Sequence, residues 1–214
     1  IIKGKVPAVA CSATNPLVTK GNDWYFRVCF LDPFQGQVMA TYAVKNLNAK
    51  TACVIQEISN DYSVGLAKFF MDSFVKLTGN EKAILAKPFS YNTGDNDFTA
   101  QVTAIAQLKP DVIFAPGNYT ESALIIKQAR DQGIKIPFLG GDTWETGPFL
   151  EVGKKSVEGA VFSTFFTSEV PMNKTSEQFL KAYREKYKKD PDAVTALGYD
   201  AYLVVRAAIE RANS

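Results

Sequence analysis

The chain has 214 residues and a formal net charge of +2, with 24 lysines and arginines against 22 aspartates and glutamates. Its 46% hydrophobic and 21% charged residues are those of an ordinary globular protein, with no charge excess that would attract nucleic acid or an anionic membrane. The sequence contains no histidine, which excludes Ser-His and Cys-His catalytic pairs and histidine metal ligands, and with them most hydrolases and zinc enzymes.

The three cysteines, Cys11, Cys29 and Cys53, each lie in an apolar run, and none belongs to a C-x-x-C pair. An odd number of cysteines in such surroundings predicts three buried free thiols instead of a disulfide framework or a metal site. No apolar run approaches the roughly 18 residues of a membrane-spanning helix, and the first residues do not form a signal peptide.

Short apolar runs alternate with amphipathic stretches along the whole chain. The apolar runs predict strands or extended segments at residues 6–11, 24–30, 51–58, 83–89, 111–115, 136–139 and 161–166. The amphipathic stretches predict helices at residues 34–47, 65–77, 98–108, 121–132, 176–188 and 194–212. This alternation is typical of βαβ units, whose right-handed crossovers place helices on both faces of a parallel sheet. The predicted fold class is therefore α/β.

In an open parallel sheet, ligands bind beyond the carboxyl ends of the strands. Several predicted strands are followed by hydroxyl, amide, carboxylate or aromatic side chains and by few cations. The residues that follow these strands are, in chain order, Ser12 and Thr14, then Ser59, Asn60, Asp61 and Tyr62, then Asn118 and Tyr119, and finally Asp142, Thr143 and Trp144. Neither G-x-G-x-x-G nor a P-loop occurs, so a nucleotide-phosphate site is not expected. Without histidine the usual general base is also missing.

These strand ends suit a small zwitterion. Hydroxyls such as Ser12 and Thr14, together with backbone N–H groups, can hold a carboxylate, and a carboxylate such as that of Asp142 can hold an ammonium group. Apolar walls are expected from the aromatic residues Tyr62, Tyr119 and Trp144. Each residue also has a purely structural interpretation, because hydroxyls cap helices, aspartates occur in turns and tryptophans fill cores. The combination at several strand ends favours a ligand site.

Several longer stretches extend this interpretation to a family. They are VPAVACSATNPLVT, YFRVCFLDPFQGQVMATY, NDYSVGLAKFF, GDNDFTAQVTAIAQLKPDVIFAPGNYTESALIIKQAR, IPFLGGDTWETGPFL, VEGAVFSTFF and KYKKDPDAVTALGYDAYLVVRAA. Over nearly the whole chain they resemble the branched-chain amino-acid-binding (Leu/Ile/Val-type) substrate-binding proteins of ABC transporters, which have the type I periplasmic-binding-protein fold. The order and spacing of the stretches carry the resemblance, and no single short motif does.

The resemblance implies two lobes, each a parallel sheet flanked by helices, joined at a hinge. Residues 1–31 and 166–214 are expected to belong to the first lobe, and residues 32–165 to form the second lobe. It also implies that the chain corresponds to the central part of a longer protein, because family members begin with a signal sequence and the opening βα units of the first lobe, and end with further strands.

The resemblance assigns the polar contacts of a ligand. The loop of Ser12, Ala13 and Thr14 matches the family segment that holds the α-carboxylate of the ligand. Asp142 stands where the family carries an acidic residue, often glutamate, that pairs with the α-ammonium group. Because aspartate is shorter than glutamate, the ammonium group is expected to lie deeper or to be reached through water.

The resemblance also assigns aromatic contacts. Tyr62 matches an aromatic residue that the second lobe contributes on closure, and Tyr119 matches a tyrosine near the amino end of the ligand. Asn118 and Trp144 are assigned to the site by their neighbourhood alone.

The implied function is that of an extracytoplasmic solute-binding protein. It captures an amino acid, expected to be aliphatic or branched-chain, by hinge closure and delivers it to the permease subunits of an ABC importer. No catalysis, metal, cofactor or nucleic-acid partner is expected, and the implied location is the periplasm or the cell surface as an anchored lipoprotein. The alternative is a ligand-sensing domain of a regulator or receptor that binds an amide or another small solute, and a flavodoxin-like or Rossmann enzyme is disfavoured.

Overall fold

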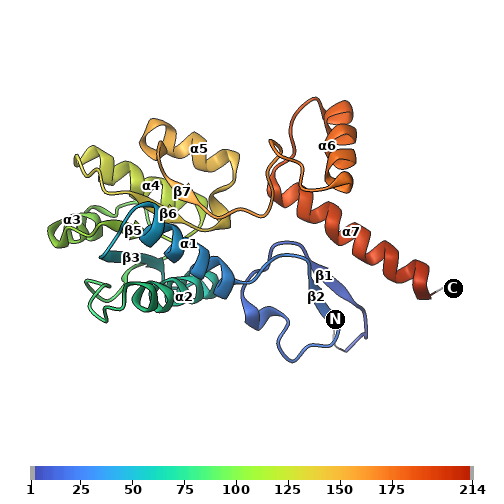
Figure 1. Ribbon diagram of the computed structural model, residues 1–214, viewed down its shortest axis with the longest axis horizontal. Coiled ribbons are helices and arrows are strands. Elements are labelled where there is room, and N and C mark those ends of the chain that lie inside the picture. Colours follow the sequence, from blue (N-terminus) through green and yellow to red (C-terminus); the bar gives the residue numbers. More distant parts are fainter. Residues whose placement is uncertain (1–2, 213–214) are drawn as a thin grey trace. The chain divides into compact units, whose positions relative to one another are not determined.

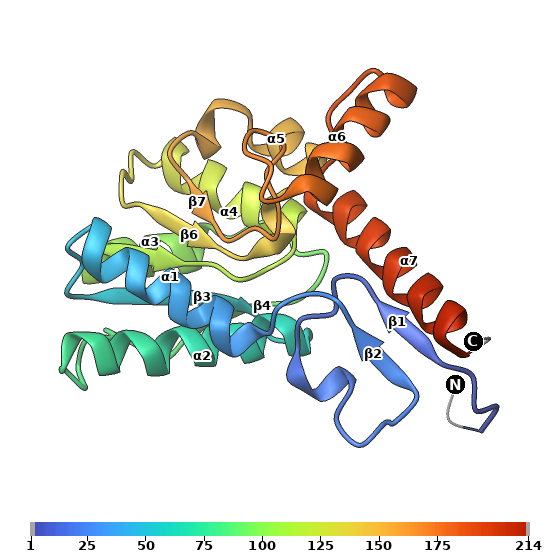
Figure 2. The same cartoon turned by 45° about the vertical axis from the view of Figure 1, so that its right-hand side comes forward.

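The computed structural model describes residues 3–212 (Figures 1 and 2). The chain divides into two compact units. Unit 1 combines the residues up to Phe30 with those from Thr164 onward, and unit 2 is the continuous segment Leu31–Ser163. Because the chain passes between the units twice, unit 2 is an insertion into unit 1.

Unit 2 is built on a parallel sheet of five strands in the order β4-β3-β5-β6-β7. The strands are β3 (Ala52–Glu57), β4 (Phe89–Tyr91), β5 (Val112–Phe114), β6 (Phe138–Gly140) and β7 (Val161–Phe162). Every neighbouring pair is parallel. Parallel strands joined by helices confirm the predicted α/β class.

Helices cover both faces of this sheet (Figures 1 and 2). They are α1 (Asp32–Asn46), α2 (Asp61–Thr78), α3 (Thr99–Leu108), α4 (Tyr119–Asp131) and α5 (Gly147–Gly153). Successive residues of β3 point to opposite faces, so Val54 packs in the core under α1 and α2, while Cys53 and Ile55 pack in the core under α3, α4 and α5. The sheet is therefore buried on both sides, as continuous apolar strands predict.

The helix pair α1 and α2 packs closely because of one glycine. A Cβ atom on Gly36 of α1 would lie 2.7 Å from the backbone nitrogen of Phe70 in α2. Only glycine fits at such a distance, so the two helices approach each other backbone to backbone at this position.

Unit 1 contains a parallel pair of strands, β1 (Ala8–Ala10) and β2 (Tyr25–Arg27), and two helices, α6 (Lys174–Tyr187) and α7 (Ala193–Ala212). A capping box between Asn173 and Ser176 begins α6. The rings of Phe179 in α6 and Tyr199 in α7 stack with centroids 4.8 Å apart, which holds the two helices together.

The structure corrects several predicted boundaries. The predicted strand at residues 83–89 is largely wrong: Ile84 forms one isolated bridge with Ala52, and β4 begins only at Phe89. Pro88 has no N–H group for a ladder, which explains the interruption. The predicted strand at residues 161–166 ends at Phe162, α2 begins at Asp61 instead of residue 65, and α5 was not predicted.

The three cysteines are free thiols, as predicted. Cys29 and Cys53 are buried, as predicted, whereas Cys11 is only partly buried. Burial raises the pKa of the Cys53 thiol to about 11. None of the helices in residues 3–212 combines the length and the apolar character that crossing a membrane requires.

Candidate functional site

The candidate site of unit 2 lies at the carboxyl edge of its sheet, where β3, β5 and β6 end. After β3, the side chain of Asn60 caps α2 by accepting a hydrogen bond from the backbone N–H of Tyr62 at 3.0 Å. This cap starts the helix at Asp61 and so places Tyr62 in its first turn. Asp61 and Tyr62, which precede the predicted helix at residues 65–77, are therefore the beginning of that helix.

Tyr62 and Asp142 meet at this edge. The hydroxyl of Tyr62 donates a hydrogen bond to Oδ1 of Asp142 at 2.9 Å. The approach requires Gly141, because a Cβ atom there would lie 2.2 Å from the Tyr62 hydroxyl. Two residues that the sequence placed after different strands thus form one polar pair.

A third residue, Gln35 of α1, links this polar pair to Asp32. Its Oε1 accepts a hydrogen bond from the backbone N–H of Asp142 at 2.8 Å, and its Nε2 donates to Oδ1 of Asp32 at 3.1 Å. Gln35 and Asp32 are fully buried. We call the four residues Asp32, Gln35, Tyr62 and Asp142 the acidic cluster.

The acidic cluster has an unusual electrostatic environment. Burial raises the pKa of Asp142, while the Tyr62 hydroxyl and the Gln35 amide act in the opposite direction. Burial and then the carboxylate of Asp142, with a smaller contribution from Asp32, raise the pKa of Tyr62 well above its ordinary value. Among residues 3–212, no lysine or arginine forms an ion pair with Asp142. The carboxylate of Asp142 therefore has no cationic partner within the described residues.

Next to it, the buried carboxylate of Glu57 organises the ends of β3 and β5. Its Oε2 accepts hydrogen bonds from the side-chain amides of Asn60 at 3.1 Å and Asn118 at 3.2 Å, and its Oε1 accepts one from the hydroxyl of Thr93. Asn118, assigned to the ligand site by its neighbourhood, thus binds Glu57 in this structure. Its role there is to hold the α4 loop against β3.

The remaining predicted residues of unit 2 lie in different surroundings. Tyr119, the first residue of α4, is 37% exposed. Trp144 is in the hydrophobic core, where its ring stacks on Phe149 with centroids 4.9 Å apart. A Cβ atom on Gly140 would touch that ring at 2.3 Å, so the indole fills the space beneath β6. The structure thus favours the core interpretation of Trp144 over an apolar wall of the site.

The Ser-Ala-Thr loop belongs to unit 1, following β1. Ser12 is exposed, Ala13 is partly buried, and Thr14 is 2% exposed. The hydroxyl of Thr14 has no hydrogen-bond partner in the part of the chain that the structure describes. A buried hydroxyl of this kind requires a partner, and a ligand or water can supply one.

Arg27 of β2 fixes this loop. Its guanidinium group donates to the backbone carbonyl oxygens of Ala13 at 2.5 Å and Asn15 at 2.8 Å. It also donates to the carbonyl of Pro16 at 3.3 Å and to the hydroxyl of Thr19 at 2.8 Å. A planar guanidinium with several donors suits this arrangement, which binds one loop at several points.

Sequence analysis did not single out Gln35, Glu57 or Arg27. For Glu57 and Arg27 a signal existed, because each is a lone charge in an apolar strand, in TACVIQEI and YFRVCF. Gln35 follows Asp32 by three positions, which places both on one helix face. Their partners, however, are far away in sequence.

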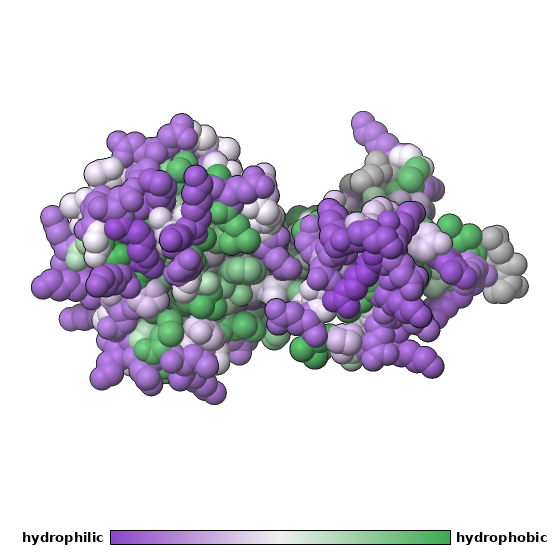
Figure 3. All heavy atoms as spheres, turned by 90° about the horizontal axis from the view of Figure 1, so that it is seen from above, coloured by the Kyte–Doolittle hydropathy of each residue, from purple (hydrophilic) through white to green (hydrophobic). Residues whose placement is uncertain are grey.

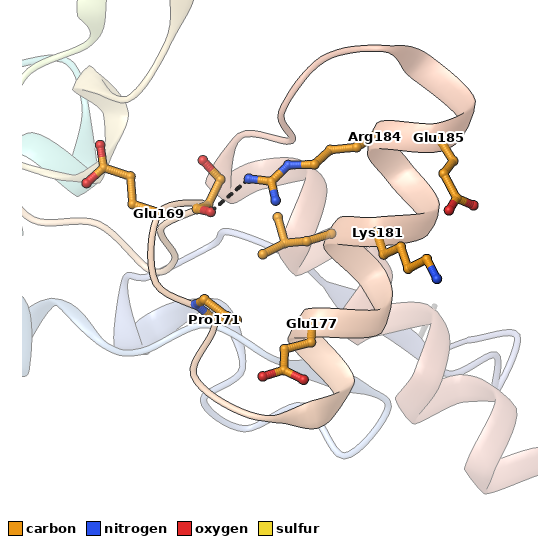
Figure 4. A pocket seen from close by; sticks show the side chains of 8 residues that line it. Glu169, Pro171, Glu177, Lys181, Arg184 and Glu185 are labelled. Atoms are coloured by element: carbon orange, nitrogen blue, oxygen red, sulfur yellow. Dashed lines mark hydrogen bonds between the residues drawn. The ribbon is translucent and has the colours of Figure 1, made fainter.

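Unit 1 also has a surface groove of about 450 Å³ between residues 168–171 and α6 (Figure 4). Its lining includes Glu169, Glu177, Lys181 and Glu185, together with Arg184, which donates to the carbonyl of Ser168 at 3.0 Å. Charges of both signs share this exposed rim, and the view in Figure 3 is likewise hydrophilic over much of its surface. Within residues 3–212 no group of three acidic or cysteine residues is placed to hold a metal ion.

Comparison with known proteins identifies the family. The family model described as periplasmic binding protein matches residues 2–214. The chain belongs to the periplasmic binding protein family. The resemblance inferred from the sequence is thereby confirmed, as is the α/β architecture of that family.

Solved structures of this family are similar in fold and sequence. The chain aligns with the leucine-binding protein LivK of Thermotoga maritima with a TM-score of 0.94 and 44% identity, over 100% of this chain and 59% of that one. It aligns with LivJ of Streptococcus pneumoniae, a branched-chain amino acid transporter substrate-binding protein in complex with isoleucine, with a TM-score of 0.84 and 34% identity, over 96% and 58% of the two chains.

A curated relative in the same family is a Leu/Ile/Val-binding protein homologue of Brucella melitensis. It is 30% identical over 208 residues, which are 96% of this chain and 54% of the relative. The chain thus spans somewhat more than half the length of the proteins that it matches.

Proposed function

We propose that the protein carrying this chain is an extracytoplasmic solute-binding protein that captures an aliphatic, branched-chain amino acid and delivers it to an ABC importer. The observation that carries the proposal is the acidic cluster. A largely buried carboxylate, Asp142, is oriented by Tyr62 at the carboxyl edge of a parallel sheet and has no cationic partner within residues 3–212. An α-ammonium group supplies that missing positive charge.

The opposite end of the ligand is assigned to unit 1. Ser12, Ala13 and Thr14 would bind the α-carboxylate through hydroxyl and backbone N–H groups. The buried, unpartnered hydroxyl of Thr14 and the rigid support from Arg27 favour this role. Since anion binding by backbone N–H groups depends on their fixed orientation, the bonds from Arg27 matter as much as the hydroxyls.

In this proposal units 1 and 2 are the two lobes, and binding stabilises their closed arrangement. Each lobe contributes one end of the ligand's contacts, so a molecule that lacks either charge stabilises closure less. Tyr62 and Tyr119 are assigned to unit 2's side of the site. The protein binds its ligand without transforming it, acts in the periplasm or at the outer cell surface, and its macromolecular partners are the permease subunits.

The test is calorimetric titration of the whole protein that carries this sequence with three probes. L-Leucine has both charged groups, 4-methylpentanoate lacks the ammonium group, and isopentylamine lacks the carboxylate. We expect binding of L-leucine and at least about a hundredfold weaker binding of the other two, because each leaves buried polar groups unpaired. Equal affinity for 4-methylpentanoate would remove the ammonium contact, and binding of amides in place of amino acids would favour a sensor.

A further inference from the structure

The side chain of Gln35 connects three parts of unit 2 that are distant in sequence. Its Oε1 accepts hydrogen bonds from the backbone N–H of Asp142 at 2.8 Å and from the hydroxyl of Ser163 at 2.5 Å. Its Nε2 donates to Asp32 at 3.1 Å. Gln35 and Asp32 are 0% exposed and Ser163 is 8% exposed, so water does not compete for these bonds.

The orientation of the Gln35 amide is determined by its partners. A backbone N–H can only donate, so the atom that faces Asp142 must be the amide oxygen. The amide nitrogen is therefore on the opposite side, towards the carboxylate of Asp32. The Gln35 side chain as a whole also lowers the pKa of Asp142. No alternative flip satisfies the same partners.

We propose that Gln35 is the positioning residue of the acidic cluster: it fixes the main chain at Asp142, and hence the direction of the Asp142 carboxylate, and ties it to Ser163, the last residue of unit 2. The assignment of Asp142 as the ammonium ligand rests on the proposed function. The positioning of Asp142 by Gln35 does not, since it follows from the hydrogen bonds alone.

The location of Ser163 gives the tie a second consequence. Unit 2 begins at Leu31 and ends at Ser163, and Gln35 lies four residues after the first of these crossings. One amide group thus joins the entry helix, the acidic cluster and the exit of unit 2. A displacement of Asp142 by a bound ammonium group is transmitted to this exit, because the backbone N–H of Asp142 and the hydroxyl of Ser163 share one acceptor atom, Oε1 of Gln35.

The test replaces Gln35 with methionine, which has nearly the same shape and no hydrogen-bonding amide. The matched control is Gln37→Met, the same change two residues along α1 at an exposed position. Two quantities are measured in the whole protein: the titration of the Asp142 carboxyl by ¹³C NMR without ligand, and the affinity for L-leucine as a function of pH.

For Gln35→Met we expect the pKa of Asp142 to rise, because the amide that lowers it is gone. The affinity for L-leucine at neutral pH should fall at least about tenfold, and its acid limb should move to higher pH. Gln37→Met should change none of these. An unchanged Asp142 titration with unchanged affinity in Gln35→Met would overturn the proposal.

Two further outcomes are covered by the design. If Gln35→Met does not fold, Ser163→Ala is the second variant, because it removes one of the two hydrogen bonds to Oε1 of Gln35. The pKa of Asp142 and the affinity for L-leucine should then shift in the same directions by smaller amounts. If neither quantity shifts, the proposal is refuted. If the wild-type protein does not bind L-leucine, the proposed function fails, whereas the carboxyl titration still decides whether Gln35 positions Asp142.

Discussion

The hydroxyl of Tyr62 donates to the carboxylate of Asp142 at 2.9 Å, although the two residues are 80 positions apart in the chain. The bond joins the first turn of α2 to the residue that follows Gly140 and Gly141 at the end of β6. A phenol that donates to a carboxylate stabilises the charged form of that carboxylate. Tyr62 therefore keeps Asp142 available for a cation in a place where burial disfavours the charge.

Replacing Asp142 with asparagine should weaken ligand binding and, at the same time, stabilise the ligand-free protein. The Asp142→Asn variant loses the charged partner of the ammonium group, so the affinity for L-leucine should fall more than about tenfold. The ligand-free variant should be more stable at neutral pH than the wild type, because a buried carboxylate is costly without a cation. Calorimetric titration and urea unfolding measure the two effects. Asp72→Asn, an exposed position on α2, serves as the control. Full affinity in Asp142→Asn would exclude Asp142 from the site.

The stability of the ligand-free protein should depend on pH through the same group. Burial raises the pKa of Asp142 in the folded state, so the folded protein keeps a proton that the unfolded chain has already released. The stability contributed by this proton is present below the ordinary pKa of aspartate and is lost as the pH rises through the raised pKa. The free energy of unfolding of the wild type, minus that of Asp142→Asn, should fall with rising pH across this window. A difference that is constant with pH would contradict the raised pKa.

Gly141→Ala tests the close approach behind the acidic cluster. The new methyl group would lie 2.2 Å from the Tyr62 hydroxyl and 3.2 Å from Oε1 of Gln35, so both partners of Asp142 must move. We expect a loss of about 1–3 kcal/mol in the free energy of unfolding, together with weaker leucine binding. Gly147→Ala is the matched control, because the atom nearest to its Cβ is Oε1 of Glu151, 4.0 Å away. Its effect should stay within about 0.5 kcal/mol. Equal stability of the two variants would show that the cluster tolerates displacement.

Arg27→Met tests the support of the Ser-Ala-Thr loop. The change removes the donors to the carbonyls of Ala13, Asn15 and Pro16 while it keeps an apolar side chain of similar length. The free energy of unfolding should fall by about 1–3 kcal/mol, and the affinity for 4-methylpentanoate and L-leucine should fall by the same factor, because both ligands carry the carboxylate. Arg27→Lys should restore only part of the loss, since an ammonium group cannot reach all the acceptors. A greater loss of affinity for isopentylamine than for the two carboxylates would contradict the assignment of the loop to the carboxylate end of the ligand.

The sequence was sufficient for the alternation of strands and helices in most of unit 2, although it did not reveal the short helix α5. Apolar runs such as the one containing Cys53 alternate with amphipathic helices, and the period of each pattern is local information. The displaced strand β4 shows the limit, because Pro88 interrupts an apolar run and the pairing partner, β3, decides where the ladder resumes. Asn60 shows another: a polar residue after a strand fits a turn and a helix cap equally well.

The candidate site was predicted only in part for a similar reason. The strand-end rule named Tyr62 and Asp142 separately, and their bond depends on how β3 and β6 are spaced across the sheet. Gln35 lies 107 positions from Asp142 and 128 from Ser163, and nothing in its local pattern reveals either partner. The environment of Trp144 could not be predicted either, because the helix that packs on an aromatic ring decides whether the ring fills a core or faces a ligand.

The insertion of unit 2 into unit 1 also orders events during synthesis. Unit 2 is continuous in sequence, so all its strands have left the ribosome once Ser163 has, and its sheet can form from neighbouring segments. Unit 1 is discontinuous in sequence, because β1 precedes unit 2 whereas α7, which contacts β1, follows it. The strands β1 and β2 can therefore complete their packing only after residues 31–163 and the following helices have been synthesised. Early completion of unit 2 shortens the effective loop that unit 1 has to close, because the Gln35–Ser163 bond brings the ends of that segment together. The same amide that orients Asp142 in the finished protein thus lowers the entropic cost of assembling the other unit.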